Sequence, residues 1–263
     1  PLTNQMKISD WEKYQELELI PDKLLWFVPF EALPAGKDAK EPLLAKLAVR
    51  YVPTLGLAIP DQRTERRDPR LAVVVGKPNA RDTAAELKQL VDNSVPTQSP
   101  FERWDLTLPA PSHIAAQVCD RLLVLADTDD TDKGPYDWAP LVIDRNKQGS
   151  RLDDWFALPW GGPLEVAFPS YRTAADSGLR KGGTGDEIFL SLCGLMSTGS
   201  RTALLSRWRL GGRSTSELMR EYHQELGHVA AAQSWRRSVK LLWEAGLTVA
   251  DEPRIRGTPT EQI

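Results

Sequence analysis

Short apolar runs alternate with amphipathic segments through the middle of the chain, and this alternation constrains the fold more than any other feature. The clearest strand pattern is Leu71–Gly76, and an amphipathic helix pattern follows it from Arg81 to Val91. Further strand patterns lie at 104–108, 121–126 and 164–168, with a helix pattern at 112–118. Strands that alternate with helices imply right-handed crossovers and a mostly parallel sheet covered on both faces. The sequence therefore predicts an α/β fold.

The two ends of the chain carry further patterns. Near the amino terminus, spacing predicts a helix over 9–19, a buried strand over 24–28 and a second strand over 49–52. In the last third, the predictions are a strand over 188–192 and helices over 200–208, 214–226 and 231–245. The 263 residues are expected to form one domain, with an insertion over 127–163 that includes a hairpin and a polar tail over 252–263. Because Pro1 is not Met, the chain is expected to be a piece of a longer protein.

Composition narrows the function classes. The net charge of −3 gives no basic field, so neither nucleic acid nor an anionic membrane is an expected partner. No apolar run approaches the roughly 20 residues of a membrane span, and no signal peptide is visible. Two cysteines fit a reducing compartment, which predicts a cytoplasmic protein.

No cofactor and no metal are expected either. No Cys or His cluster has zinc spacing, and the glycine-rich run at 181–185 lacks P-loop spacing and is interpreted as a turn. The acidic residues between Asp127 and Asp132 lack an EF-hand pattern, so they are interpreted as a solvated loop.

Cys193 is the residue that most suggests chemistry. It follows the apolar run Ile188–Leu192, and a thiol at the carboxyl end of a central strand lies where α/β folds place their active sites. The alternative is a small apolar core residue, since free cysteine is among the most buried residue types. Cys119, between a helix and a strand, is expected to be structural.

A cysteine nucleophile needs a base or a cation nearby. The strand before Cys193 is followed by Tyr171 and Arg172, and no histidine lies there. The three histidines of the chain are interpreted as helix-start or solvated residues; they are His113, His223 and His228. Arg172 could lower the pKa of a thiol but cannot accept its proton, so a structural or ligand-binding role is preferred.

Two regions of the chain together resemble the CHAT domain, a family related to caspases and separases. The carboxyl-terminal part of the resemblance is the run from Glu187 to Gly194, the turn at 197–201, the motif Leu205–Trp208 and the helix pattern that starts at Ser214. The amino-terminal part is Leu25–Leu33, similar to the family's P-F-x-A-L element, followed by Tyr51–Val52–Pro53. The closest similarity is to CHAT proteins of planctomycete-type bacteria.

The resemblance implies a caspase-like three-layer sandwich with a His–Cys dyad at the carboxyl ends of adjacent strands. Cys193 falls at the nucleophile position, and Arg172 occupies the position where relatives carry the histidine. Gly194, Ser170 and Tyr171 would line the site and supply the oxyanion contacts. The implied partners are a peptide or protein and fused or bound sensor or repeat domains.

Three hypotheses follow. The chain is a caspase-like cysteine endopeptidase module, or a pseudopeptidase of the same fold that binds peptides or acts as a scaffold. The third possibility is an unrelated α/β module in which Cys193 only packs. A base near a reactive thiol indicates the first, an accessible cleft without thiolate chemistry the second, and a buried Cys193 without a cleft the third.

Overall fold

The computed structural model describes parts of the chain between residues 13 and 246. The described residues are 13–35, 41–58, 71–75, 101–105, 120–125, 129–130, 141–142, 163–169, 185–197, 199–207, 212–226 and 228–246.

A five-stranded sheet forms the centre of the molecule, and every strand pairing in it is parallel. Its order is β11-β10-β7-β5-β6, so β11 and β6 are its edges. The strands are β5 (Leu71–Val75), β6 (Phe101–Asp105), β7 (Arg121–Leu125), β10 (Glu165–Phe168) and β11 (Thr202–Leu205). The predicted strands at 71–76, 121–126 and 164–168 are confirmed, and β6 begins three residues before the predicted 104–108.

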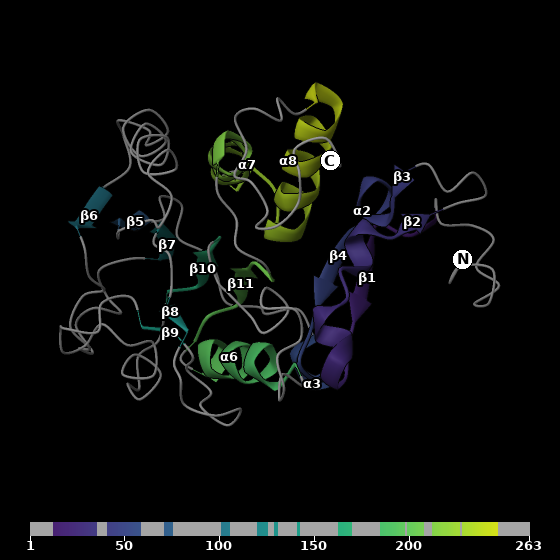
Figure 1. Ribbon diagram of the computed structural model, residues 1–263, viewed down its shortest axis with the longest axis horizontal. Coiled ribbons are helices and arrows are strands. Elements are labelled where there is room, and N and C mark those ends of the chain that lie inside the picture. Colours follow the sequence, from purple (N-terminus) through teal and green to yellow (C-terminus); the bar gives the residue numbers. More distant parts are fainter. Residues whose placement is uncertain are drawn as a thin grey trace.

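Helices cover the two faces of this sheet (Figure 1). Helix α6 (Asp186–Ser197) lies on one face, while α7 (Gly212–Glu225) and α8 (Ala231–Ala245) lie on the other. Leu122 of β7 and Phe168 of β10 are almost completely buried in this sheet. Both predicted carboxyl-terminal helices are confirmed, and the arrangement is the predicted α/β sandwich with a parallel central sheet.

The amino-terminal segment forms a smaller unit beside the edge strand β11 (Figure 1). Its centre is a parallel pair of strands, β1 (Glu16–Leu19) and β4 (Ala48–Tyr51). Its other elements are η2 (Lys23–Phe27), η3 (Phe30–Ala32), β2 (Pro34–Ala35), β3 (Glu41–Pro42), α2 (Leu43–Lys46) and α3 (Leu55–Ala58). A buried cluster that includes Leu44 and Leu47 packs this unit against Trp235 and Val239 of α8.

Two amino-terminal predictions are wrong. The segment predicted as a helix over 9–19 contains strand β1, whose side chains alternate between exposed and partly buried with the period of a strand. The segment predicted as a strand over 24–28 contains the 3₁₀ helix η2, in which Leu24 and Leu25 are exposed while Trp26 and Phe27 are buried. A run of five apolar residues does not distinguish a strand from a short helical turn.

The predicted strand at 188–192 is also wrong, because these residues lie within α6. The buried positions Ile188, Ser191, Leu192 and Leu195 follow the spacing i, i+3, i+4, i+7, which is the pattern of one helix face. The helix is 12 residues long and forms the crossover between β10 and β11.

The predicted helix at 200–208 is instead the strand β11. Helix α6 ends in a Schellman motif: Gly199 has φ +112°, its N–H donates to the Met196 carbonyl, and the Ser200 N–H donates to the Leu195 carbonyl. The Arg201 and Thr202 N–H groups then donate to the Leu164 carbonyl, which starts the pairing with β10. Sheet pairing therefore overrides the local helix pattern.

Within the predicted insertion at 127–163, β8 (Asp129–Asp130) pairs antiparallel with β9 (Leu141–Val142), as the expected hairpin requires. The predicted tail at 252–263 and the helix patterns at 81–91 and 112–118 lie outside the described residues.

Candidate functional site

Cys193 lies inside helix α6 and not at the carboxyl end of a strand. Cys193 is partly buried, and this burial raises the pKa of its thiol above the ordinary value. A raised pKa keeps the sulfur in its protonated, weakly nucleophilic form. The structural reason for expecting a nucleophile here, a strand end, is therefore absent, and the assignment of that role to Cys193 stays a prediction.

Gly194 also lies in the body of α6. At that place in a helix a backbone N–H is bonded to the carbonyl four residues earlier, so it is not available to hold an oxyanion. Its carbonyl accepts a hydrogen bond from the Ser197 hydroxyl at 2.7 Å. The other predicted site residues, Ser170, Tyr171 and Arg172, lie outside the described residues.

The described histidines have no geometry that suits a catalytic base. His223 is in α7, on the opposite face of the sheet from α6 (Figure 1). Its Nε2 is buried without a hydrogen-bond partner among the described residues. Burial, reinforced by the charge of Arg121, lowers the pKa of His223 to about 4. His228 is exposed, and His113 lies outside the described residues.

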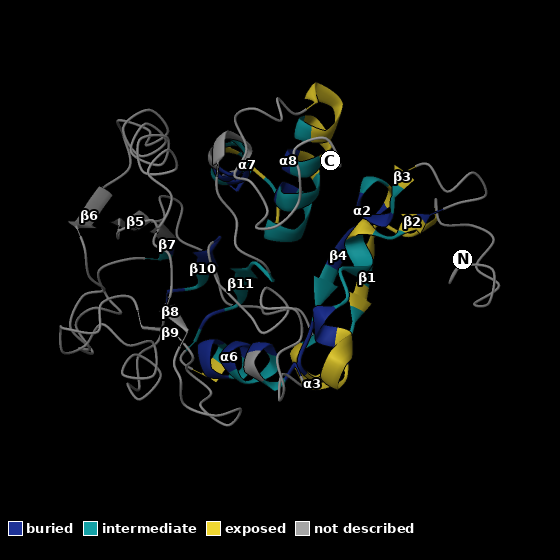
Figure 2. Ribbon diagram, in the orientation of Figure 1, coloured by how far each residue is buried: buried dark blue, intermediate teal, exposed yellow. Residues whose placement is uncertain are grey.

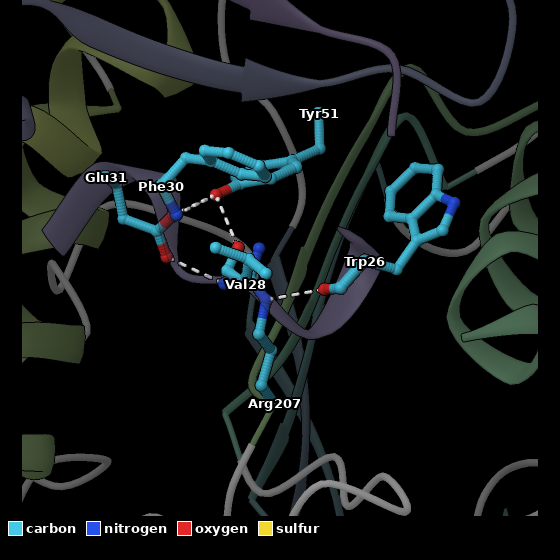
Figure 3. Close-up of polar contacts among 6 residues, drawn as sticks. All are labelled: Trp26, Val28, Phe30, Glu31, Tyr51 and Arg207. Carbon is cyan, nitrogen blue, oxygen red and sulfur yellow. Dashed lines mark hydrogen bonds and ion pairs between the residues drawn. The ribbon is translucent and has the colours of Figure 1, made fainter. Parts of the chain in front are cut away.

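A cluster of charged and aromatic side chains occupies the carboxyl end of β11, the strand that actually follows β10 in the sheet. Figure 3 shows Arg207, two residues beyond β11, between η2 and η3. Its Nε donates to the Trp26 carbonyl at 2.8 Å, and its Nη1 donates to Glu31 Oε1 at 2.7 Å. Its Cζ lies 4.5 Å from the centre of the Tyr51 ring, in a cation–π contact.

The Tyr51 hydroxyl completes this cluster. It accepts a hydrogen bond from the Phe30 N–H at 2.9 Å and donates to Glu31 Oε2, with the Val28 carbonyl oxygen 3.4 Å away (Figure 3). Burial is the main reason that the pKa of Tyr51 is raised, and the Glu31 charge raises it further. The phenol is therefore neutral and acts as a fixed donor. The Arg207 cluster (Trp26, Glu31, Tyr51 and Arg207) joins β11 to the amino-terminal unit.

A cavity of about 390 Å³ adjoins this cluster. One wall is the edge strand β11 and the opposite wall is β4, with residues 202–205 and 49–51 on the two sides. Helix α6 contributes Ile188, Leu192 and Met196, and α8 contributes residues 231–233 and Trp235. Its volume lies at the lower end of the range for small-ligand sites, about 300–1,000 Å³.

Sequence reasoning singled out neither the cluster nor the cavity as a site. Its members lie in the runs Leu25–Leu33, Tyr51–Pro53 and Leu205–Trp208, which carry the family resemblance. The available signal was that each of these three separated motifs places an aromatic residue near a charged residue or a proline. Nothing in the sequence showed that they meet in space.

The fold and this cluster define an α/β sandwich whose parallel sheet is joined to an amino-terminal unit by a partly buried arginine. A comparison with protein families identifies a CHAT domain, with a match over residues 1–104. The match supports the recognition of the CHAT domain and, with it, a kinship to caspase-like peptidases. It includes three members of the Arg207 cluster but neither Cys193 nor Arg172. No curated protein matches the chain.

Two further findings concern the described residues only. None of their helices has the length and apolar character needed to cross a membrane. They also contain no group of three or more His, Cys, Asp or Glu side chains that could hold a metal ion.

Proposed function

We propose that this chain is a CHAT module that binds an extended segment of a peptide or protein and does not hydrolyse it. The observation that carries the proposal is the position of Cys193 in the middle of the crossover helix α6. A nucleophile for acyl transfer needs an exposed sulfur beside oxyanion donors and a base. Among the described residues, the thiol of Cys193 lies in a helix body next to a glycine whose N–H is used by the helix, and no base stands beside it.

The electrostatics point the same way. Burial raises the pKa of Cys193, whereas an activated cysteine has a lowered pKa. Removing a general base typically lowers a rate by about 10²–10⁴-fold. Residual thiol reactivity would therefore be far too slow for a dedicated peptidase.

Kinship to peptidases supports binding of a peptide rather than of an unrelated ligand. The cavity between β4 and β11 is largely apolar and adjoins two strand edges, which suits an extended chain. The proposed function is therefore recognition of a polypeptide without its cleavage.

The test is incubation of the chain with a proteome-derived peptide library, followed by mass-spectrometric detection of new termini. We expect no new termini beyond those formed with the Cys193→Ala variant. New termini that appear with the natural chain and disappear with Cys193→Ala would establish the endopeptidase alternative instead. Ser197→Ala, one turn further along α6, is the matched control for effects on the helix alone.

A further inference from the structure

The cavity beside β11 lies in the plane of the central sheet. β11 is the last strand of that sheet, and β4 is one of the two strands of the amino-terminal sheet. Both strands line the same cavity. Helix α6 closes it from one face of the sheet, and α8 closes it from the other. The space is therefore situated where one more strand would lie between β11 and β4.

The backbone of β11 directs hydrogen-bonding groups toward this space. Its N–H groups at Thr202 and Ser206 donate to Leu164 and Phe168 of the β10 side. Because successive residues of a strand direct their N–H and C=O groups to opposite sides, Ala203 and Leu205 direct theirs away from β10. Among the described residues, no strand pairs with that edge.

The backbone of β4 has the same arrangement on the opposite wall. The Ala48 and Val52 N–H groups donate to Gln15 and Leu19 on the β1 side. Val49 and Tyr51 therefore direct their backbone groups away from β1, and both residues line the cavity. Among the described strands, two edges without a pairing strand thus border one cavity.

The strands become less buried from β10 to the edge strand β11. Val166, Ala167 and Phe168 of β10 are buried, whereas all four residues of β11 are only partly buried. Figure 2 shows this step from dark blue in β10 to teal in β11. An edge strand that is covered by helices but remains partly exposed has space beside it for a further strand.

The walls are held in place independently of any ligand. The amino-terminal unit is fixed to α8 by its apolar cluster and by the hydrogen bond from Arg236 to the Ala45 carbonyl at 3.0 Å. The Arg207 cluster joins the end of β11 to η2 and η3. A preformed slot saves the ordering cost that a flexible site incurs on binding.

The charges on the walls indicate the character of the occupant. Arg50 is paired with Glu16 and Glu18, and Arg207 is paired with Glu31. Arg201, which also lines the cavity, has an interaction partner as well. A charged side chain brought into the slot would be buried without a partner, at a large cost. The apolar remainder of the walls, such as Leu192 and Met196, favours uncharged side chains.

We propose that an uncharged, apolar segment of a partner polypeptide inserts between β11 and β4 as an extended strand. The segment would bond to the backbone of Ala203 and Leu205 on one side and of Val49 and Tyr51 on the other. It would join the two sheets into one continuous sheet. This inference rests on the proposed function, for which it names the site and the ligand class.

The test begins with a phage-displayed library of random 12-residue peptides selected on the whole chain. We expect enriched peptides rich in Val, Ile, Phe and Thr and poor in charged residues. Calorimetry with one enriched synthetic peptide then compares the natural chain with Ala203→Pro, which removes an edge N–H but no bond to β10. We expect about two- to tenfold weaker binding, as the loss of one hydrogen bond implies.

Two controls keep the test decisive. The same peptide N-methylated at alternate amides leaves the protein unchanged. We expect each of the two methylation patterns to weaken binding, because one removes bonds to β11 and the other removes bonds to β4, and this holds even if Ala203→Pro folds poorly. Trp243→Ala removes an exposed apolar side chain on α8 and should leave the affinity unchanged. No enriched peptide, binding that is insensitive to both methylation patterns, or binding that depends on Trp243 would overturn the inference. Cleavage of the peptide would contradict only the proposed function.

Discussion

The guanidinium of Arg207 lies over the ring of Tyr51, with 4.5 Å between its Cζ and the ring centre, and both side chains bond to the Glu31 carboxylate. Arg207 follows the last strand of the central sheet, and Tyr51 ends the second strand of the amino-terminal sheet. The two residues are 156 positions apart in the chain, and their contact joins the central sheet to the amino-terminal sheet beside the cavity.

The Arg207→Ala substitution should therefore be strongly destabilising. It leaves the partly buried Glu31 without its cation and the Trp26 carbonyl without its donor, so we expect a loss of about 3 kcal/mol in the free energy of unfolding. Urea denaturation measures it. The matched control is Arg220→Ala, which removes the more exposed pair with Glu221 and should cost no more than about 1 kcal/mol. Equal losses for the two variants would contradict the structural role of Arg207.

Gly185 should not tolerate a side chain. It has φ +89°, and a Cβ at this position would lie 2.1 Å from the Lys23 carbonyl oxygen. Gly185→Ala must separate the start of α6 from η2, and we expect a loss of about 2 kcal/mol or more.

Gly56 provides the comparison for this substitution. It lies in the short helix α3, and a Cβ there would meet nothing within 4 Å. Gly56→Ala should be neutral or stabilising by up to about 1 kcal/mol, because alanine is the better helix former. Thermal unfolding of both variants checks the pair, and a neutral Gly185→Ala would show that α6 and η2 are not in contact as described.

The stability of the chain should fall in mildly acidic solution because of His223. Its pKa is about 4 in the folded chain against 6.5 ordinarily, so the unfolded chain binds more protons between these values. The free energy of unfolding therefore decreases as the pH falls from about 6.5 to about 4, by at most about 1.4 kcal/mol per pH unit from this group.

Urea denaturation at several pH values, compared with the His223→Gln variant, isolates this contribution. We expect the variant to lose much of the pH dependence in that interval, whereas His228→Gln, at an exposed position, should retain it. A His223→Gln profile parallel to that of the natural chain would show that the imidazole is not buried as a neutral group.

The sequence was sufficient for elements whose pattern is long or flanked by clear turns. The strands β5, β7 and β10 and the helices α7 and α8 were predictable, and with them the α/β class. Short apolar runs were not, because five residues such as Ile188–Leu192 fit a strand and one helix face equally well. Their structure is decided by tertiary contacts, here the packing of Ile188, Leu192 and Leu195.

The candidate site was predictable only as a set of motifs. The resemblance pointed to Leu25–Leu33, Tyr51 and the Leu205–Trp208 motif, but it directed attention to Cys193 because that residue was assigned to a strand. Once β11 replaces a helix and α6 replaces a strand, Arg207 and not Cys193 stands near the end of the strand beside β10. Register and sheet order depend on long-range pairing that one sequence does not reveal.

The most direct test of the central proposal, that this chain lacks an activated thiol, is the pH dependence of Cys193 alkylation by iodoacetamide in a Cys119→Ser background. The partly buried position in α6 predicts slow reaction and an apparent thiol pKa at or above the ordinary value of about 8.5. An apparent pKa below about 7, with rapid alkylation of the folded chain, would contradict it.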